Sequence, residues 1–236
     1  MNATTPCLYL IPSTLGNEDT ELFLPKGTIE IIHQLKYFIV ENEKTARAFL
    51  KSCKIVFPQS ELIILELDKH DPKQDIQTFL KHSKDGHSIG LLSEAGCPAV
   101  ADPGSLIVAA AHRLNLTVKP LVGPSSLLLA LMASGLEGQR FCFHGYLPID
   151  RDPKSKAILK LEREAQVNKQ TQIFIETPYR NNTLLKDLLS ICNNDTRLCI
   201  AVDLNTPSEW IKTMRIQEWK KQIPELHKKQ VVFLLL

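Results

Sequence analysis

The sequence lacks the glycine-rich and metal-binding signatures of several common enzyme classes. It holds only 10 glycines in 236 residues, and the patterns G-x-x-x-x-G-K-[ST], G-x-G-x-x-G and H-E-x-x-H are all absent. Its seven histidines show no metal-ligand spacing. These absences argue against a phosphate-loop ATPase and against a zinc enzyme, and we expect no metal ion.

Long apolar runs and a targeting segment are also missing. The longest apolar runs, such as Ser105–Ala111 and Val231–Leu236, are far shorter than the roughly 20 residues of a membrane-spanning helix. The N-terminus enters a strand-like segment, Cys7–Ile11, without a basic region or a long apolar region before it. We therefore expect a cytoplasmic protein with no signal peptide and no membrane segment.

Cysteine pairs of the form C-x-x-C are absent as well. The six cysteines are scattered, and Cys7, Cys142 and Cys199 fall in apolar, strand-like stretches. This favours small buried hydrophobic side chains in a reducing compartment, with disulfides or a metal site as the alternative.

The overall composition is that of a globular protein. Hydrophobic residues make up 44% and charged residues 23% of the chain, and the net charge is +2. A chain of this length buries roughly 70% of its extended surface, which suffices for one large domain or two small ones. The charge is uneven, because residues 1–139 carry a net −3 and residues 140–236 a net +5. A basic half can recruit an anionic partner such as RNA, although solvated surface is the commoner explanation.

Short apolar strands alternate with helical patterns through residues 1–139. This alternation predicts a largely parallel sheet that is covered on both faces. Strands are expected at Cys7–Ile11, Tyr37–Val40, Leu62–Leu67, Ser88–Leu92 and Thr117–Val122. Helices are expected at Thr28–Leu35, Lys44–Lys51, Pro72–His82 and Gly104–Leu114. The segment Ser125–Ser134 is apolar on nearly every face, which predicts a buried helix.

A second α/β domain is expected over residues 140–236. Its early part alternates strands and helices, at Phe141–Tyr146, Lys154–Gln166, Gln172–Ile175 and Asn181–Ile191. The later strands, Leu198–Val202, Glu209–Thr213 and Gln230–Leu236, have no full helix between each of them, which indicates mixed or antiparallel pairing. The sequence thus predicts two α/β domains, 1–139 with a largely parallel sheet and 140–236 with a mixed sheet.

Three turns rich in small residues follow predicted strands of the first domain. They are Pro12–Asn17, Ser93–Pro98 and Gly123–Ser126. The carboxyl ends of parallel strands share one edge of the sheet, where open α/β sheets bind ligands, and small residues let a ligand approach the backbone. Any one of these turns is also typical of an ordinary chain reversal. All three at one edge favour a binding site.

Longer segments around these turns carry a family resemblance. The chain reads LYLIPSTLGN from residue 8, LLSEAGCPAVADPGSLIV from 91, PLVGPSSLLLALMASGL from 120, RFCFHGYLP from 140 and IETPYR from 175. Taken in order, these segments resemble the tetrapyrrole-methylase-like class of S-adenosylmethionine (SAM)-dependent methyltransferases. Within that class, the chain is most similar to the bacterial 16S ribosomal RNA cytidine-2′-O-methyltransferases. The resemblance implies two α/β domains with SAM in the cleft between them, usually as a homodimer.

The resemblance also implies cofactor-binding positions in both predicted domains. In the first domain they are Pro12, Gly16, Ser93, Glu94, Ala95, Gly96, Cys97, Pro98 and Ser125. In the second domain they are Phe143, Tyr146, Leu147, Glu176, Thr177 and Ala201. Apolar side chains such as Leu147 and Met132 suit an adenine ring. SAM carries no phosphate, which agrees with the missing phosphate loop.

Glu94 is the candidate catalytic residue. Methyl transfer from SAM mainly requires that the nucleophile be aligned with the methyl group while water is excluded. A ribose 2′-hydroxyl must lose its proton on the way, and a nearby carboxylate could assist. Alternatively, Glu94 is a turn carboxylate that bonds to the backbone. We interpret Cys97 as a small turn residue, since this transfer needs no covalent enzyme intermediate.

Three segments depart from the RNA-methylating branch. The S-D-A-G-T-P motif of that branch is SEAGCP at Ser93–Pro98, E-D-T-R is ENEK at Glu41–Lys44, and R-E-L-T-K is VDLNT at Val202–Thr206. An arginine and a lysine are lost and the acidic Glu43 is added, which weakens phosphate recognition. Basic residues late in the chain could compensate or form a solvated face; they are Lys212, Arg215, Lys220, Lys221, Lys228 and Lys229.

Three functions therefore stay open. The first is a SAM-dependent methyltransferase that acts on a cytidine ribose 2′-hydroxyl of 16S ribosomal RNA, with that RNA or the small ribosomal subunit as its partner. The second is a SAM-dependent methylase of a tetrapyrrole or another small molecule. The third is a SAM-binding module without turnover.

Overall fold

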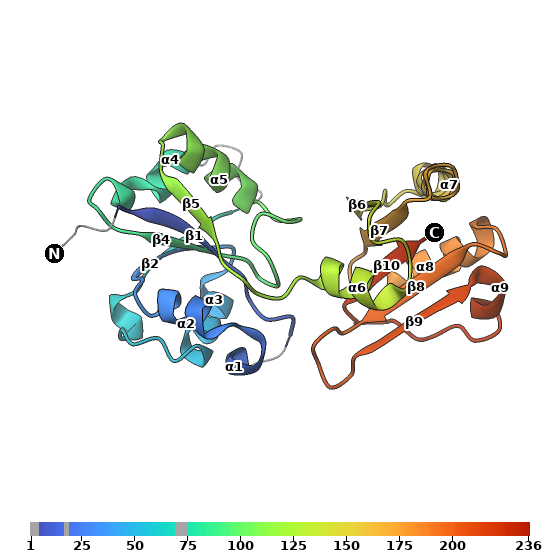
Figure 1. Cartoon of the computed structure of the whole chain (residues 1–236), viewed down its shortest axis with the longest axis horizontal. Coiled ribbons are helices and arrows are strands. Elements are labelled where there is room, and N and C mark those ends of the chain that lie inside the picture. The colour runs from blue at the N-terminus through green and yellow to red at the C-terminus, as the bar shows by residue number, and fades with distance from the viewer. Residues whose placement is uncertain (1–4, 17–18, 69–74) are drawn as a thin grey trace. The chain divides into compact units, whose positions relative to one another are not determined.

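The computed structural model describes residues 5–16, 19–68 and 75–236, which form two units that divide between Ser125 and Ser126 (Figure 1). The sequence analysis divides the chain at residue 139 instead. The difference is the helix α6 (Ser126–Ser134), which packs against strands of the second unit. Each unit is an α/β layer structure, as the sequence predicts.

The first unit is built on a five-stranded parallel sheet with the strand order β3-β2-β4-β1-β5. The strands are β1 (Cys7–Ile11), β2 (Tyr37–Val40), β3 (Ile63–Glu66), β4 (Ile89–Leu92) and β5 (Thr117–Pro120). Figure 1 shows α1 (Thr20–Phe23), α2 (Lys26–Ile32) and α3 (Glu43–Ser52) on one face, and α4 (Ile76–Phe79) and α5 (Gly104–Arg113) on the other. Two short 3-10 turns lie at Gln59–Glu61 and Lys81–Ser83.

The side chains of consecutive strand residues pack into two separate hydrophobic cores, one on each face of the sheet. Phe38 packs toward α1–α3 with Ile11, whereas its neighbour Ile39 packs toward α4 and α5 with Leu8. Successive side chains of a strand point to opposite faces, so a continuous apolar strand can supply both cores. The prediction of a parallel sheet covered on both faces is therefore confirmed.

A glycine sits where the centre of this sheet is most crowded. Gly90 lies on β4, paired with Tyr9 of β1 and Phe38 of β2. A Cβ atom at this position would lie 2.6 Å from Cδ1 of Ile11 and 2.9 Å from Cδ1 of Phe38. Both of those side chains are fully buried, so the missing side chain lets them fill the space beside β4.

The second unit has a mixed sheet with the strand order β6-β7-β10-β8-β9. The strands are β6 (Phe141–Tyr146), β7 (Thr171–Ile175), β8 (Arg197–Val202), β9 (Trp210–Arg215) and β10 (Val231–Leu235). Only β6 and β7 are parallel. The helices α7 (Arg151–Asn168), α8 (Asn181–Ile191) and α9 (Ile216–Trp219) contribute to the main core of this unit, and the buried strand predicted at the end of the chain is its central strand β10.

The helix α6 is less buried than its sequence predicts. Ala130, Leu131 and Ser134 are buried on its packed side, but Leu128 is 51% exposed and Met132 is 79% exposed. The prediction of a helix buried on all sides is wrong, because α6 packs against β8, β9 and β10 through one side only and its other side is exposed. Because apolar residues lie on nearly every side of α6, the sequence does not indicate which side packs against the sheet.

Several smaller expectations can be compared with the same structure. Helix α4 lies within the helix expected at Pro72–His82, whose first residues fall outside the described ranges, and the 3-10 turn after it overlaps the end of that helix. All six cysteines are free; four are buried, and Cys97 and Cys142 are partly buried. None of the helices in the described ranges combines the length and apolar character that a membrane span requires.

We predict that Gly90→Ala lowers the free energy of unfolding by about 1–3 kcal/mol, because the new methyl group overpacks the space beside Ile11. Ile11→Val removes the nearest atom, so the double variant should be destabilised by less than the sum of the two single changes. Urea unfolding of the four proteins measures this coupling. Gly27→Ala is the matched control, since its Cβ meets nothing within 4 Å on α2. Additive costs would contradict the prediction.

Candidate functional site

The site lies where the connections of two neighbouring strands diverge. From β1 the chain runs through α1 and α2 to β2, and from β4 it crosses through α5 to β5 on the opposite face. The strands β1 and β4 are adjacent and parallel, with Ile11 level with Leu92. Open α/β sheets bind ligands at such a point, outside the carboxyl ends of the strands.

The turns after β1 and β4 are joined directly. The backbone N–H of Ser13 donates to the carbonyl of Gly96 at 2.9 Å, and the N–H of Gly96 donates to the carbonyl of Ser13 at 3.2 Å. The Ser93 hydroxyl donates to the Gly96 carbonyl at 2.6 Å and lies 3.5 Å from the Ser13 hydroxyl. Both serine side chains are buried, so these contacts hold the two turns together in a fixed arrangement.

The third small-residue turn joins the same cluster. The backbone of Gly123 lies against the ring of Pro12, and the Cys97 thiol donates to the carbonyl of Pro124 at 3.5 Å. Burial raises the pKa of the Cys97 thiol, although a hydrogen bond with Ser125 acts in the opposite direction. A protonated thiol agrees with the interpretation of Cys97 as a turn residue. The three predicted turns therefore do meet, except that Asn17 falls outside the described residues.

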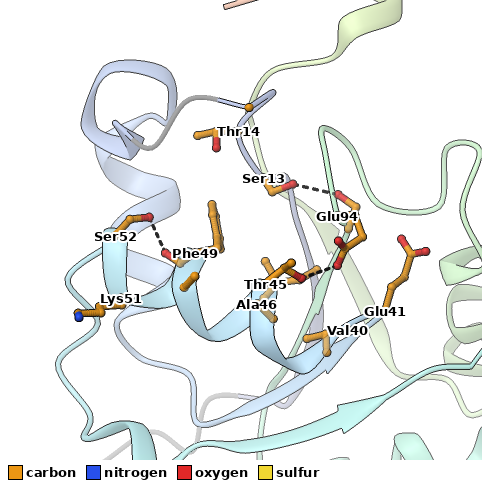
Figure 2. A pocket seen from close by; sticks show the side chains of 14 residues that line it. Ser13, Thr14, Val40, Glu41, Thr45, Ala46, Phe49, Lys51, Ser52 and Glu94 are labelled. Atoms are coloured by element: carbon orange, nitrogen blue, oxygen red, sulfur yellow. Dashed lines mark hydrogen bonds between the residues drawn. The ribbon is translucent and has the colours of Figure 1, made fainter. Parts of the chain in front are cut away.

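A pocket of about 650 Å³ opens beside the first two turns. Its floor is apolar and buried, with Val40, Ala46 and Leu92. Figure 2 shows Ser13 and Thr14 on one side, facing the helix α3, with Glu94 and Glu41 at one end. The volume falls in the range of roughly 300–1,000 Å³ that is usual for small-molecule sites. Of the expected cofactor positions, the pocket includes Gly16, Ser93 and Glu94.

Glu94 reaches into this pocket and bonds to α3. Its Oε1 accepts a hydrogen bond of 2.7 Å from the Thr45 hydroxyl (Figure 2). The helix begins here because Asn42 caps it, accepting a hydrogen bond of 3.1 Å from the N–H of Thr45. The bond between Thr45 and Glu94 therefore connects the turn after β4 to the first turn of α3.

The helix α3 contributes a wall of the pocket that the sequence does not predict. Thr45, Phe49 and Ser52 line the pocket with a spacing of four and three residues, which places them on one side of the helix. On sequence alone, this side is hard to tell from the neighbouring one that carries Ala46 and Leu50 into the core. The closeness of α3 to the turn after β4 is a tertiary contact without a local signal.

The loop after the Ser93–Pro98 turn holds an unusual backbone conformation. Ala99 and Ala101 have φ angles of 65° and 62°, each costing roughly 1–2 kcal/mol relative to ordinary backbone. Oδ1 of Asp102 accepts hydrogen bonds from the N–H groups of Ala99 at 2.8 Å and Gly104 at 2.7 Å. Burial raises the pKa of Asp102, and these two hydrogen bonds only partly offset it.

Three of the six candidate positions of the second unit lie at one edge of its sheet. Tyr146 ends β6 and is more than half exposed, and Glu176 and Thr177 follow β7. Oε1 of Glu176 accepts hydrogen bonds from the Arg180 guanidinium at 2.7 and 3.0 Å. Three other positions lie deeper in the unit: Ala201 on β8 is fully buried, Leu147 belongs to the core, and Phe143 lies on β6.

The segment that departs from R-E-L-T-K forms an ion pair at the same edge. The Asp203 carboxylate accepts hydrogen bonds from Lys229 Nζ at 2.7 Å, from the Ser208 hydroxyl at 2.9 Å and from the N–H of Gln230 at 2.9 Å. Burial acts to raise the pKa of Asp203, but these bonds together outweigh it and hold the pKa below its usual range. Lys229 is thereby occupied within the protein.

The six late basic residues do not share one surface. Lys228 and Lys229 precede β10 at this edge, whereas Arg215 and Lys220 lie at the opposite edge beside α9. Arg215 pairs with Asp195 at 2.8 Å, and Lys220 donates to Asn194 at 2.7 Å. The idea that these residues jointly hold RNA therefore loses its geometric basis.

No group of three His, Cys, Asp or Glu side chains in the described ranges is arranged to hold a metal ion. The site instead consists of turns rich in small residues and a pocket with apolar and acidic side chains. Both lie at the carboxyl ends of parallel strands, where the connections from β1 and β4 lead to opposite faces of the sheet. These features are typical of α/β proteins that bind small organic molecules.

Sequence comparison identifies the family. The sequence model of the Tetrapyrrole (Corrin/Porphyrin) Methylases matches residues 8–219, so the chain belongs to this family and is a methyltransferase of the SAM-dependent type. A protein of Buchnera aphidicola subsp. Schizaphis graminum named ribosomal RNA small subunit methyltransferase I is 27% identical over 235 residues, 98% of this chain and 78% of that one. The protein of the same name from Vibrio cholerae serotype O1 is 28% identical over 213 residues, 90% and 70% of the two chains.

Solved structures show the same fold at lower identity. Diphthine synthase superposes with a TM-score of 0.70 at 14% identity, covering 98% of this chain and 89% of that one. The cobalt precorrin-4 methyltransferase CbiF superposes with a TM-score of 0.65 at 15% identity, covering 100% and 96%. These similarities confirm the two-domain α/β fold.

We predict that Asp102→Asn is at least as stable as the wild type at pH 7, because the amide oxygen can still accept both hydrogen bonds without a buried charge. A raised pKa in the folded state means that stability from this carboxyl is fully present below its unfolded pKa and is lost as the pH rises through the folded one. Any advantage of Asp102→Asn should therefore shrink between pH 7 and pH 4.

Asp102→Ala is the companion variant and should cost about 1–3 kcal/mol, because two N–H groups lose their acceptor. Thermal unfolding of the three proteins at both pH values measures these differences. Equal losses in both variants at pH 7 would mean that the charge of Asp102 is needed in the fold.

Proposed function

We propose that this methyltransferase uses SAM to methylate ribosomal RNA of the small subunit, at the ribose 2′-hydroxyl of a cytidine. The observation that carries the proposal is the near full-length similarity to proteins named ribosomal RNA small subunit methyltransferase I, combined with a pocket at the switch point of the first sheet. The RNA, the nucleotide and the methylated atom all belong to the proposal.

The residues at this edge fit SAM. Gly96 has a φ of +75°, and a Cβ there would lie 3.3 Å from Leu15 and 3.5 Å from the carbonyl of Pro124, so the turn keeps its backbone accessible only without a side chain. The pocket carries the carboxylates of Glu41 and Glu94, which suit the ammonium and sulfonium groups of SAM better than they suit a phosphate. In the first unit, Pro12, Gly16, Ser93–Pro98 and Ser125 are the residues proposed to hold the cofactor; Phe143, Tyr146, Leu147, Glu176, Thr177 and Ala201 stay candidates in the second.

When bound, SAM would supply an electrophilic methyl group on its sulfonium. The chain's own part is to fix the acceptor oxygen in line with that group and to keep water away. Because Ser13 and Gly96 lock the two turns together, the backbone groups offered to the ligand are preorganised. Glu94 stays the candidate for accepting the proton of the acceptor hydroxyl, with its carboxylate positioned by Thr45.

Two further expectations remain, the first from the family resemblance and the second from the sequence features described above. We expect a homodimer, which sedimentation of the purified protein tests. We also expect the protein in the cytoplasm, where fractionation would place it together with the ribosomes.

We predict that wild-type protein transfers label from methyl-labelled SAM to 16S RNA in small subunits taken from a strain that lacks the gene. Gly96→Leu should lower the incorporation at least tenfold, because the side chain is strained at this φ and crowds Leu15. Gly27→Leu, on the exposed face of α2, should retain full incorporation.

Calorimetry with SAM completes the test. SAM binding without label in any RNA would reject the RNA substrate and favour a small-molecule methylase or a module that binds SAM without turnover. Absence of SAM binding would reject the cofactor site itself.

A further inference from the structure

The helix α3 presents two adjacent stripes of side chains with different chemistry. Thr45, Phe49 and Ser52 face the pocket. The next stripe, Lys44, Ala48 and Lys51, is exposed, and Ala48 and Lys51 lie at the rim of the pocket. Both stripes follow the spacing of four and three residues that keeps side chains on one side of a helix. A ligand in the pocket would therefore meet the first stripe, and any part of it that leaves the pocket across α3 would meet the second.

The interior of the pocket suits a flat, uncharged ring with N–H donors. Phe49 is partly exposed to the pocket, above the buried Val40 and Leu92. Glu41 and Glu94 add carboxylates, which accept hydrogen bonds from amino groups of bases and repel phosphates. An unpaired base can stack on an aromatic side chain and offer its edge to such acceptors.

The outer stripe has the opposite charge. Lys44 and Lys51 are seven residues apart, which separates them by about 10 Å along the helix axis. Neither forms an ion pair within the described ranges, and Lys51, which lines the rim of the pocket, extends its side chain outward in Figure 2. By contrast, Arg47 is tied to Glu43 at 2.7 Å and to the carbonyl of Gln59. The acidic Glu43 is therefore neutralised, and Lys44 and Lys51 are the cations of α3 that remain available to phosphates.

We propose that the α3 side of the pocket is the acceptor subsite and receives one unpaired nucleoside of an RNA strand. Its base lies inward on the ring of Phe49, its ribose hydroxyl faces the carboxylate of Glu94, and its flanking phosphates stay outside on Lys44 and Lys51. The proposal rests on the proposed function and adds to it the residues that select the acceptor. Thr45 is a positioning residue, because its hydroxyl orients Glu94 at 2.7 Å. Apart from Glu94, the turns after β1 and β4 are left to the cofactor.

The stacking contact is tested by Phe49→Leu, which keeps an apolar side chain but removes the ring. Stacking of one base is worth roughly 1–3 kcal/mol, so the KM and the Kd for small subunits should rise at least fivefold. The Kd for SAM should stay within twofold of the wild type. Phe57→Leu is the matched control, since Phe57 packs against the same core but does not line the pocket.

The phosphate contacts are tested by the double variant Lys44→Ala/Lys51→Ala. Losing two contacts to a single strand should reduce the slope of log Kd against log salt concentration by about 1.4. Lys81→Ala/Lys84→Ala removes the same charge at the opposite edge of the sheet, before β4, and should leave the slope unchanged. Kd is measured by filter binding of labelled small subunits.

The outcomes separate this inference from the proposed function. Wild-type methylation with an unchanged KM in Phe49→Leu and an unchanged salt slope in Lys44→Ala/Lys51→Ala overturns the acceptor subsite and leaves the function intact. A higher Kd for SAM in Phe49→Leu overturns it as well, because the ring would then serve the cofactor. Subunit binding that depends on both sets of residues, without any methylation, would support the subsite and reject the function. Neither binding nor methylation would reject both.

Discussion

The parallel pairing of β1 with β4 is the constraint on which the first unit depends. It sets Ile11 level with Leu92, so both strands end at the same height and their following turns can bond to each other. The strands can pack this closely because Gly90 has no side chain, so that Ile11 and the ring of Phe38 on β2 fill the space beside it. The pocket, the small turns and the contact between Glu94 and α3 all follow from two strand ends held side by side.

In the proposed subsite, the negatively charged side chains lie inside the pocket and the positively charged ones lie at its rim. Carboxylates line the pocket and lysines flank it, so a phosphodiester strand would be attracted to the rim while its charged groups are discouraged from entering. This arrangement also accounts for the departure at Glu41–Lys44. Glu43 is neutralised by Arg47, and Lys44 supplies a cation where the RNA-methylating branch has its arginine. In the second unit Asp203 neutralises Lys229 in a comparable way.

The predictions that succeeded rest on local signals. Apolar runs gave the strands, and the small residues after β1, β4 and β5 indicated an edge where the structure does bring three turns together. What failed depends on tertiary packing. An apolar helix such as α6 contains no information about which side will be covered, and Thr45 and Phe49 reach the site only because α3 folds back beside Glu94. The conformation at Ala99 and Ala101 has no signal either, since alanine is an uncommon choice for it.

The position of β10 has a consequence for how the chain folds during synthesis. All five strands of the first sheet precede Ser126, whereas the centre of the second sheet is occupied by Val231–Leu235, between β7 and β8. At about 5–20 residues per second, the first unit can fold while most of the second is still being translated. The second sheet cannot close until its last strand emerges, so β7 and β8 each expose an unpaired edge in the meantime. Nascent chains of this protein are therefore expected to need protection late in translation, with the first unit already formed.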